Sequence, residues 1–231
     1  MITPRYDRER GHADHGWLDA RHTFSFADFH DPAHMGFQTL RVLNEDRIAP
    51  GGGFGTHPHR DMEIVTWVID GALEHRDSMG NGEVLRAGEI QRMSAGSGIT
   101  HSEVNASQTA GIHLLQIWIL PERMGITPSY EQRAVDDQEL RGRWAQLVAP
   151  GAPGRALDIH QDARFLATRL DAGSMVDLEM EDRHLWLHVV AGDVEVHGIP
   201  LTAGDGAAVS GEQVLTLTAR TAAEIVAIDM A

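Results

Sequence analysis

A pattern repeated in the two halves of the chain limits its possible folds most strongly. Residues 65–77 and 85–96 read VTWVIDGALEHRD and LRAGEIQRMSAG, and residues 187–198 and 201–211 read LHVVAGDVEVHG and LTAGDGAAVSG. Each copy predicts a strand, a glycine turn and a second strand, followed by Leu-x-Ala-Gly, an acidic residue and a further strand. Such self-similarity indicates that one supersecondary unit occurs twice.

Glycines at matching places align the two copies with each other. The alignment pairs Gly71 with Gly192, Gly88 with Gly204, and Gly96 with Gly211. A chance likeness between two β-hairpins is the alternative explanation. The paired glycines favour two tandem copies of one β-barrel over that alternative.

Most of the remaining segments also favour strands over helices. β-branched and aromatic residues are abundant at 37–43, 63–69, 113–120, 184–190 and 214–219. Only residues 131–147 lean towards a helix, and a turn-rich loop follows at 149–154. We therefore predict an all-β fold with an N-terminal barrel at 1–130, a connection at 131–165 and a C-terminal barrel at 166–231.

The composition argues against several classes of protein. No apolar run is long enough to cross a membrane, and the N-terminus does not read as a secretory signal. The chain has no cysteine, which removes disulfides and thiolate ligands and leads us to expect a cytoplasmic protein. The net charge is -15, and the 19 basic residues are all arginines that form no basic cluster, so direct nucleic-acid binding is disfavoured.

Two short motifs carry the candidate chemistry. His57-x-His59 places two imidazoles two residues apart, and such residues on a strand point to the same face. His101-x-Glu103 repeats this arrangement further along the chain, and a glycine turn precedes each pair. If the two strands are neighbours in a barrel, the four side chains can surround one ion. Imidazole and carboxylate together suit Fe, Cu, Ni, Mn, Co or Zn better than Ca or Mg.

These residues resemble the two signature motifs of the cupin superfamily, which implies a bicupin of two jelly-roll (double-stranded β-helix) barrels. The first motif, G-x5-HxH-x3/4-E-x6-G, is followed by Gly51, His57, His59, Glu63 and Gly71, with seven residues between the last two. The second, G-x5-PxG-x2-H-x3-N, is followed by Gly88, Gly98, His101 and Asn105. It has two extra residues after Gly88, and Gly96 stands at the proline position.

Both departures from the general cupin motifs are characteristic of one branch of the cupins, the pirin family, which this chain resembles. Segments 10–32, 53–71, 75–103 and 114–121 look like pirin segments, and the likeness is nearest to bacterial pirin-like quercetin 2,3-dioxygenases. Pirins bind one metal ion through three histidines and a glutamate that follows the third histidine by two residues. The resemblance therefore implies the ligands His57, His59, His101 and Glu103.

Two glutamates compete for the fourth ligand position. Glu63 occupies the general cupin position and shares strand parity with His57 and His59. The resemblance to pirins favours Glu103, which has the same parity as His101. Glu63 is then expected to orient one of the imidazoles through a hydrogen bond.

The other histidines have simpler interpretations. Packing roles are expected for the histidines near the N-terminus, which are His12, His15, His22, His30 and His34. His75 and His113 are interpreted either as ordinary barrel residues or as partners of a ligand.

The second copy is expected to lack the metal site. The glycine alignment places Leu178 and Met180 at the positions of the first histidine pair, and Thr216 and Thr218 at those of His101 and Glu103. His184 and His188 are four residues apart and do not recreate the paired arrangement. One metal ion per chain is therefore expected.

The resemblance implies a dioxygenase that cleaves flavonols such as quercetin with O2 and releases carbon monoxide. Glu103 would be the catalytic base that takes the proton of the substrate's 3-hydroxyl group. The alternative is a metal-binding pirin without enzymatic activity that acts as a regulatory partner of other proteins, which an acidic surface would suit. A cupin isomerase or epimerase acting on a sugar is a third reading. Oxygen consumption with a flavonol distinguishes the first two.

Overall fold

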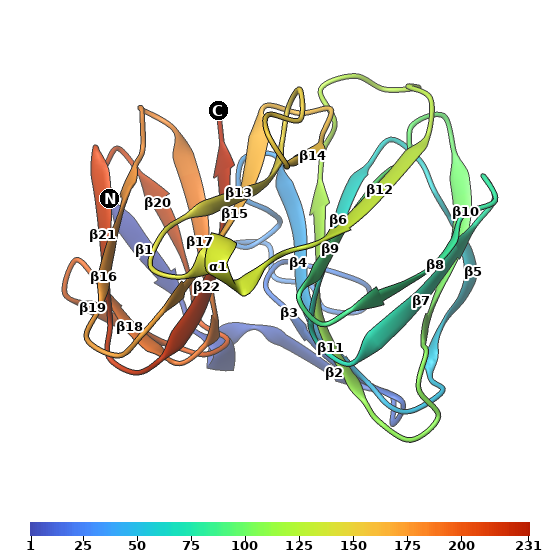
Figure 1. The fold of residues 1–231 in the computed structure, drawn as a ribbon, viewed down its shortest axis with the longest axis horizontal. Coiled ribbons are helices and arrows are strands. Elements are labelled where there is room, and N and C mark those ends of the chain that lie inside the picture. The colour runs from blue at the N-terminus through green and yellow to red at the C-terminus, as the bar shows by residue number, and fades with distance from the viewer. The chain divides into compact units, whose positions relative to one another are not determined.

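The chain folds into two compact units, each made of two antiparallel β-sheets (Figure 1). They are seen in a computed structural model that describes residues 1–231. The N-terminal barrel consists of Gly11–Val135 and Leu157–Gln161. The C-terminal barrel consists of Met1–Arg10, Asp136–Ala156 and Asp162–Ala231.

The strands of the N-terminal barrel are β2 (Gly11–Asp14), β3 (Leu18–His22), β4 (Leu40–Ile48), β5 (Gly53–His59), β6 (Glu63–Asp70), β7 (Ala72–Asp77), β8 (Gly82–Arg86), β9 (Glu89–Ser94), β10 (Ile99–Asn105), β11 (Ile112–Ile119), β12 (Ser129–Ala134) and β14 (Leu157–Asp158). One sheet has the order β12-β9-β6-β11-β4-β3-β2, and the other has the order β5-β10-β7-β8.

The elements of the C-terminal barrel are β1 (Ile2–Arg5), a 3-10 helix (Asp7–Glu9), α1 (Asp137–Leu140), β13 (Ala145–Ala149), β15 (Ala163–Leu170), β16 (Met175–Glu179), β17 (His184–Ala191), β18 (Asp193–Val196), β19 (Ile199–Thr202), β20 (Gly206–Ser210), β21 (Val214–Ala219) and β22 (Ala223–Met230). Its larger sheet has the order β1-β20-β17-β22-β15-β13, and its smaller sheet has the order β16-β21-β18-β19.

The predicted repeat is confirmed strand by strand. The order β9-β6-β11-β4 in one barrel corresponds to β20-β17-β22-β15 in the other, and β5-β10-β7-β8 corresponds to β16-β21-β18-β19. All six glycines of the repeat alignment have a positive φ, a backbone conformation that glycine adopts without steric cost. The predicted all-β fold of two tandem antiparallel barrels is therefore confirmed.

The boundaries of the units differ from the expected 1–130, 131–165 and 166–231, because each barrel takes an outer strand from outside its repeat. β1 pairs with β20, so the first ten residues belong to the C-terminal barrel. β12 pairs with β9, so the N-terminal barrel continues to Val135.

The segment expected to lean towards a helix forms little helix. Only α1 is helical, and the Asp136 side chain caps it by accepting a hydrogen bond from the Gln138 N–H at 2.9 Å. Residues 129–134 instead form β12 along the edge of β9. Strand pairing outweighs the weak local preference for a helix.

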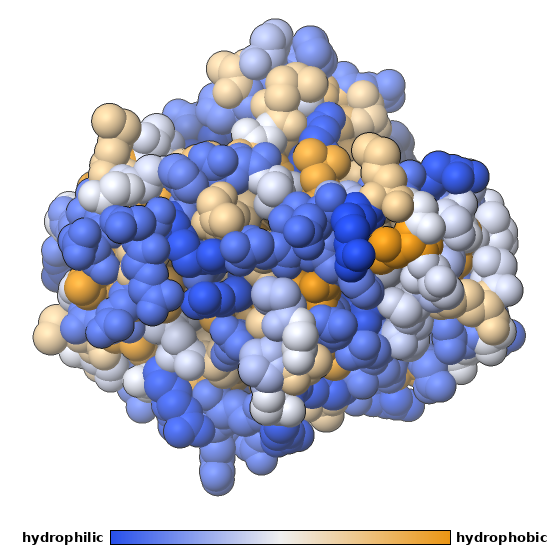
Figure 2. Space-filling view, turned by 90° about the horizontal axis from the view of Figure 1, so that it is seen from above, coloured by the Kyte–Doolittle hydropathy of each residue, from blue (hydrophilic) through white to orange (hydrophobic).

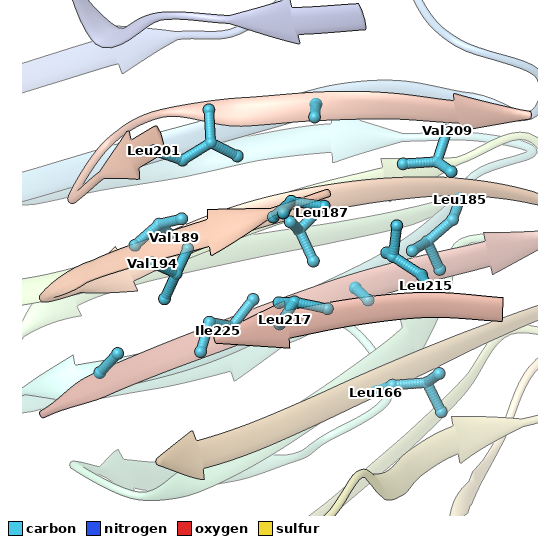
Figure 3. Packing of buried hydrophobic residues seen from close by; sticks show 14 of the residues in the cluster. Leu166, Leu185, Leu187, Val189, Val194, Leu201, Val209, Leu215, Leu217 and Ile225 are labelled. Atoms are coloured by element: carbon cyan, nitrogen blue, oxygen red, sulfur yellow. The ribbon is translucent and has the colours of Figure 1, made fainter. Parts of the chain in front are cut away.

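The two barrels have different interiors. In the C-terminal barrel, leucine and valine side chains from both sheets fill the space between them, as Figure 3 shows for Leu187, Leu215 and Leu217. In the N-terminal barrel, smaller apolar clusters are accompanied by buried polar side chains. These polar side chains include His22, Asn44, Asp46, Thr66, His101, Glu103 and Gln116. Burying polar groups is unfavourable unless they find partners, so this interior is where a functional site is expected.

No helix of the structure has the length and apolar character needed to cross a bilayer. The face seen in Figure 2 is covered mainly by hydrophilic residues, and its hydrophobic residues form small separate patches. A face of this kind offers no large apolar docking area.

Gly192→Ala is expected to destabilise the protein strongly. Gly192 has φ 80°, and an added Cβ would lie 2.2 Å from the Ala222 carbonyl oxygen. The backbone strain alone is about 1–3 kcal/mol. The matched control is Gly198→Ala, where φ is 84° but a Cβ would meet nothing within 4 Å. Chemical denaturation should show a larger loss in the free energy of unfolding for Gly192→Ala than for Gly198→Ala. Equal losses would show that the approach to the Ala222 carbonyl oxygen does not matter.

Candidate metal centre

A cavity of about 200 Å³ lies inside the N-terminal barrel. Its lining includes the four sequence-predicted residues His57, His59, His101 and Glu103. Aromatic side chains form another part of the wall, namely Phe26, Phe54 and Trp118. The polar side chains of His22, Asn44, Asp46 and Gln116 complete much of the remainder. An apolar cavity with a few polar groups is the usual form of a small-molecule site.

The three predicted histidines converge because β5 and β10 are paired. His101 lies opposite His57, and Ile99 lies opposite His59. The Nε2 atoms of His57 and His101 are 3.0 Å apart, and one ring nitrogen of each histidine lies within 4.8 Å of those of the others. The structure therefore brings together three side chains that the sequence separates into two motifs.

The local environment favours the neutral form of His59 and His101. Burial and the nearby charge of His57 lower the pKa of His59 to about 4. Burial, followed by the charges of His57 and His59, lowers the pKa of His101 to about 2. His57 Nδ1 lies 2.8 Å from the Gly55 carbonyl oxygen, which can only accept, so His57 donates its proton there. The His57 Nε2 lone pair therefore faces the other histidines.

Glu103 is buried beside them with one oxygen unused. It lies two residues after His101 on β10 and is 3% exposed. Its Oε2 accepts a hydrogen bond from Gln116 Nε2 at 2.8 Å, while its Oε1 has no hydrogen-bond partner. Burial raises the pKa of Glu103 to about 7, against the opposing effect of the Gln116 hydrogen bond. A buried carboxylate oxygen without a partner is costly unless a cation or a proton satisfies it.

Glu63 does not line the cavity. Its Oε2 accepts hydrogen bonds from Ser94 Oγ at 2.9 Å and from the His160 backbone N–H at 3.3 Å. Burial raises the pKa of this carboxyl group. The imidazole beside Glu63 is that of His160, with Nδ1 at 3.8 Å, and not one of the three converging histidines.

His75, His101 and Glu103 form a second group whose ligand-type atoms lie within 4.8 Å of one another. The two groups share His101, whose two ring nitrogens face different neighbours. Its Nε2 faces His57, and its Nδ1 lies 3.5 Å from His75 Nδ1.

Three of the remaining histidines lie beside carboxylates. His12 lies 3.3 Å from Asp19, His34 lies 2.6 Å from Asp31, and His113 lies 2.8 Å from Glu45.

His22 differs from these, because it lines the cavity and is hydrogen-bonded to Asn44 Oδ1 at 3.0 Å. Sequence reasoning missed His22, Asn44 and Asp46 as cavity residues. Asn44 and Asp46 are polar residues two apart on the largely buried strand β4, a signal that could have identified them.

The C-terminal barrel has apolar residues at the corresponding positions. Asn105 on β10 pairs with Leu73 on β7, and Ala219 on β21 pairs in the same way with Val194 on β18. When Asn105 is aligned with Ala219, Leu215 corresponds to His101 and Leu217 corresponds to Glu103. The glycine alignment had placed Thr216 and Thr218 at these positions, and that prediction was wrong by one residue. Leu178 lies opposite Leu215, as His57 lies opposite His101. His184 Nδ1 is hydrogen-bonded to Ser210 Oγ at 2.7 Å. This barrel contains no group of three candidate ligands.

Comparison with known protein families covers nearly the whole chain. The family model described as Pirin matches residues 4–119, and that described as quercetinase C-terminal cupin domain matches residues 146–230. Quercetin 2,3-dioxygenase of Escherichia coli (strain K12) is 49% identical, over 100% of this chain and 99% of the relative. A pirin-like protein of Caulobacter vibrioides is 44% identical over 100% of both chains.

Solved structures agree with these similarities. The bacterial pirin YhhW from Escherichia coli, in complex with nickel(II), has a TM-score of 0.95 and 46% identity, over 100% of this chain and 99% of that one. A quercetin 2,3-dioxygenase from Acinetobacter baumannii has a TM-score of 0.79 at 20% identity and shares the fold, over 99% of this chain and 85% of that one. The chain is therefore a bicupin that belongs to the pirin family.

Proposed function

We propose that this protein is a metal-dependent dioxygenase that cleaves flavonols such as quercetin, with loss of carbon monoxide. The observation that carries the proposal is the convergence of three imidazoles in a cavity with aromatic walls, which a buried carboxylate also lines. The relatives named quercetin 2,3-dioxygenase support the substrate class.

The residues present fit a divalent transition-metal ion. His57, His59, His101 and Glu103 offer three nitrogens and one oxygen, which is a donor set that Fe, Cu, Ni, Mn, Co and Zn accept. The unpartnered Oε1 of Glu103 is the kind of atom that a cation would satisfy. The nickel complex of the similar YhhW protein supports the same proposal. When bound, the ion would act as a Lewis acid that lowers the pKa of a coordinated hydroxyl group.

The side chains around this centre can bind and orient a flat phenolic substrate. Phe26, Phe54 and Trp118 offer ring faces and edges to an aromatic ligand. The Trp118 ring already makes an edge contact with His59, with the ring centroids 4.9 Å apart. Asn44 and Asp46 supply polar groups to the same cavity for the hydroxyl groups of the substrate. This lining favours an aromatic substrate that carries several hydroxyl groups.

Glu103 is positioned to receive the proton of the substrate's 3-hydroxyl group. A pKa near 7 lets a carboxylate accept a proton and release it again at neutral pH. Gln116 holds Oε2, and Thr66 Oγ1 holds the Gln116 side chain at 3.1 Å, so Oε1 is the oxygen left for the proton. Glu103 is thus both ligand and base in this proposal, which requires that the metal ion would hold its carboxylate only loosely.

The test uses the full chain purified without a histidine tag or added metal. We expect metal analysis to give one ion per chain, and an oxygen electrode to record uptake with quercetin together with carbon monoxide release. The matched control is flavone, which lacks the 3-hydroxyl group and should not be oxidised. Chelation should abolish uptake, and returning the metal should restore it. If metal-replete protein consumes no oxygen with any flavonol, a metal-dependent binding role becomes the better account.

A further inference from the structure

A chain of buried side chains continues outward from His101. His75 Nδ1 lies 3.5 Å from His101 Nδ1, and His75 Nε2 lies 3.1 Å from Asp77 Oδ2. The side chains of His75 and Asp77 are both fully buried. The Tyr130 ring stacks on that of His75, with the centroids 4.7 Å apart and an interplanar angle of 27°. The His75 ring is therefore held in one orientation between the carboxylate and the proposed ligand.

The hydrogen bonds of Asp77 determine where the protons lie. Its Oδ1 accepts from the backbone N–H groups of Met79 and Asn81 at 2.9 and 3.1 Å, and its Oδ2 accepts from Asn81 Nδ2 at 2.8 Å. An ionised carboxylate can only accept, so His75 carries its proton on Nε2 and has a lone pair on Nδ1. His101 must then carry its proton on Nδ1, facing that lone pair.

We propose that Asp77 and His75 are positioning residues that hold His101 in the Nδ1–H tautomer, so that its Nε2 lone pair faces the metal position. This inference rests on the metal site of the proposed function. Partners of this kind, which orient a ligand without touching the metal, are typically worth about 10–100-fold in metal affinity. Nothing in the spacing of the sequence motifs distinguishes His75 from an ordinary barrel residue.

The C-terminal barrel provides a comparison within the same chain. By the strand registers, Val196 corresponds to His75, and Gly198, two residues later, corresponds to Asp77. The positions of His101 and Glu103 are held there by Leu215 and Leu217, which pack in the apolar core. The barrel without the candidate ligands thus also lacks the side chains that would orient them.

Asp77→Asn tests the proposal because the backbone restricts how an amide can sit there. The N–H groups of Met79 and Asn81 require the amide oxygen at the Oδ1 position, which turns the NH2 group towards His75. The same NH2 group faces the Asn81 side chain, whose amide must flip to offer its oxygen in place of Nδ2. His75 must then accept at Nε2 and carry its proton on Nδ1. His101 would be forced to place its own proton on Nε2, which blocks the nitrogen that faces His57.

Two measurements follow the effect without using turnover. Long-range 1H–15N correlation spectra of the metal-free protein should show His101 protonated at Nδ1 in the wild type and at Nε2 in Asp77→Asn. Competition with a chelator should show nickel affinity reduced by about 10–100-fold. His75→Phe keeps a ring to stack on Tyr130 but removes the acceptor, and should also weaken nickel binding.

The control is Glu45→Gln, which makes the same chemical change beside His113 in the same barrel. His113 Nε2 lies 2.8 Å from Glu45 Oε1, and neither residue lines the cavity. This variant should leave the His101 tautomer and nickel affinity unchanged. The proposal is overturned if His101 keeps its Nδ1 proton in Asp77→Asn, or if nickel is found bound by His75, His101 Nδ1 and Glu103. Because no flavonol is used, a failure of the dioxygenase proposal would leave these results interpretable.

Discussion

Glu103→Gln is expected to keep most of the metal while losing about 10²–10⁴-fold in flavonol turnover, the usual contribution of general-base catalysis. The amide can still offer a carbonyl oxygen to the ion. It cannot take a proton from the substrate at neutral pH, whereas the buried carboxyl group of Glu103 has its pKa raised to about 7. Metal analysis and oxygen uptake on the same preparation would measure both properties.

The control for Glu103→Gln is Glu63→Gln, which makes the same change at the competing glutamate. Glu63 is buried but accepts from Ser94 and His160 outside the cavity, so its variant should retain most activity. Near-full activity in Glu103→Gln would show that Glu103 is not the base. Glu63 would then be the next residue to examine.

His101→Ala is expected to lose metal and activity together. It removes the imidazole whose Nε2 lies 3.0 Å from that of His57, and leaves an opening at the position of this proposed ligand. Removing a ligand should cost more than the roughly 10–100-fold typical of a residue that only orients one. Metal content after dialysis, and activity before and after adding metal in excess, would separate lost affinity from lost catalysis.

His184→Ala is the matched control for this loss. His184 lies in the C-terminal barrel, where Ser210 is its hydrogen-bond partner and no group of candidate ligands exists. It should bind metal as the wild type does. A lower metal content in His184→Ala with a normal metal content in His101→Ala would place the ion in the C-terminal barrel and overturn the proposed site.

Local patterns in the sequence were enough to predict the architecture and three of the converging side chains. Paired glycines marked equivalent turns because a positive φ is a local requirement of the backbone. His57 and His59 share a face because side chains alternate along a strand, which holds whatever the strand packs against. The segments similar to pirins added the family, which the comparisons confirm.

Strand parity did not separate the two glutamates; the resemblance to pirins favoured Glu103, and the tertiary structure gives a physical reason for that preference. Glu63 and Glu103 both have the parity expected of a ligand, but β6 and β10 belong to different sheets. Only β10 pairs with the strand that carries His57 and His59. Parity specifies a face of a strand, whereas the choice of neighbouring strand depends on contacts between distant parts of the chain.

Register also depended on these distant contacts. The alignment of the copies placed Thr216 and Thr218 at the ligand positions, whereas strand pairing places Leu215 and Leu217 there. A shift of one residue exchanges the two faces of a strand, and the alternation of Leu215 and Leu217 with Thr216 and Thr218 was the local signal for the buried face. No such signal existed for His75, whose contact with His101 exists only because β7 pairs with β10. The sequence by itself determined the kind of barrel and its histidine pairs, and strand pairing decided which side chains surround them.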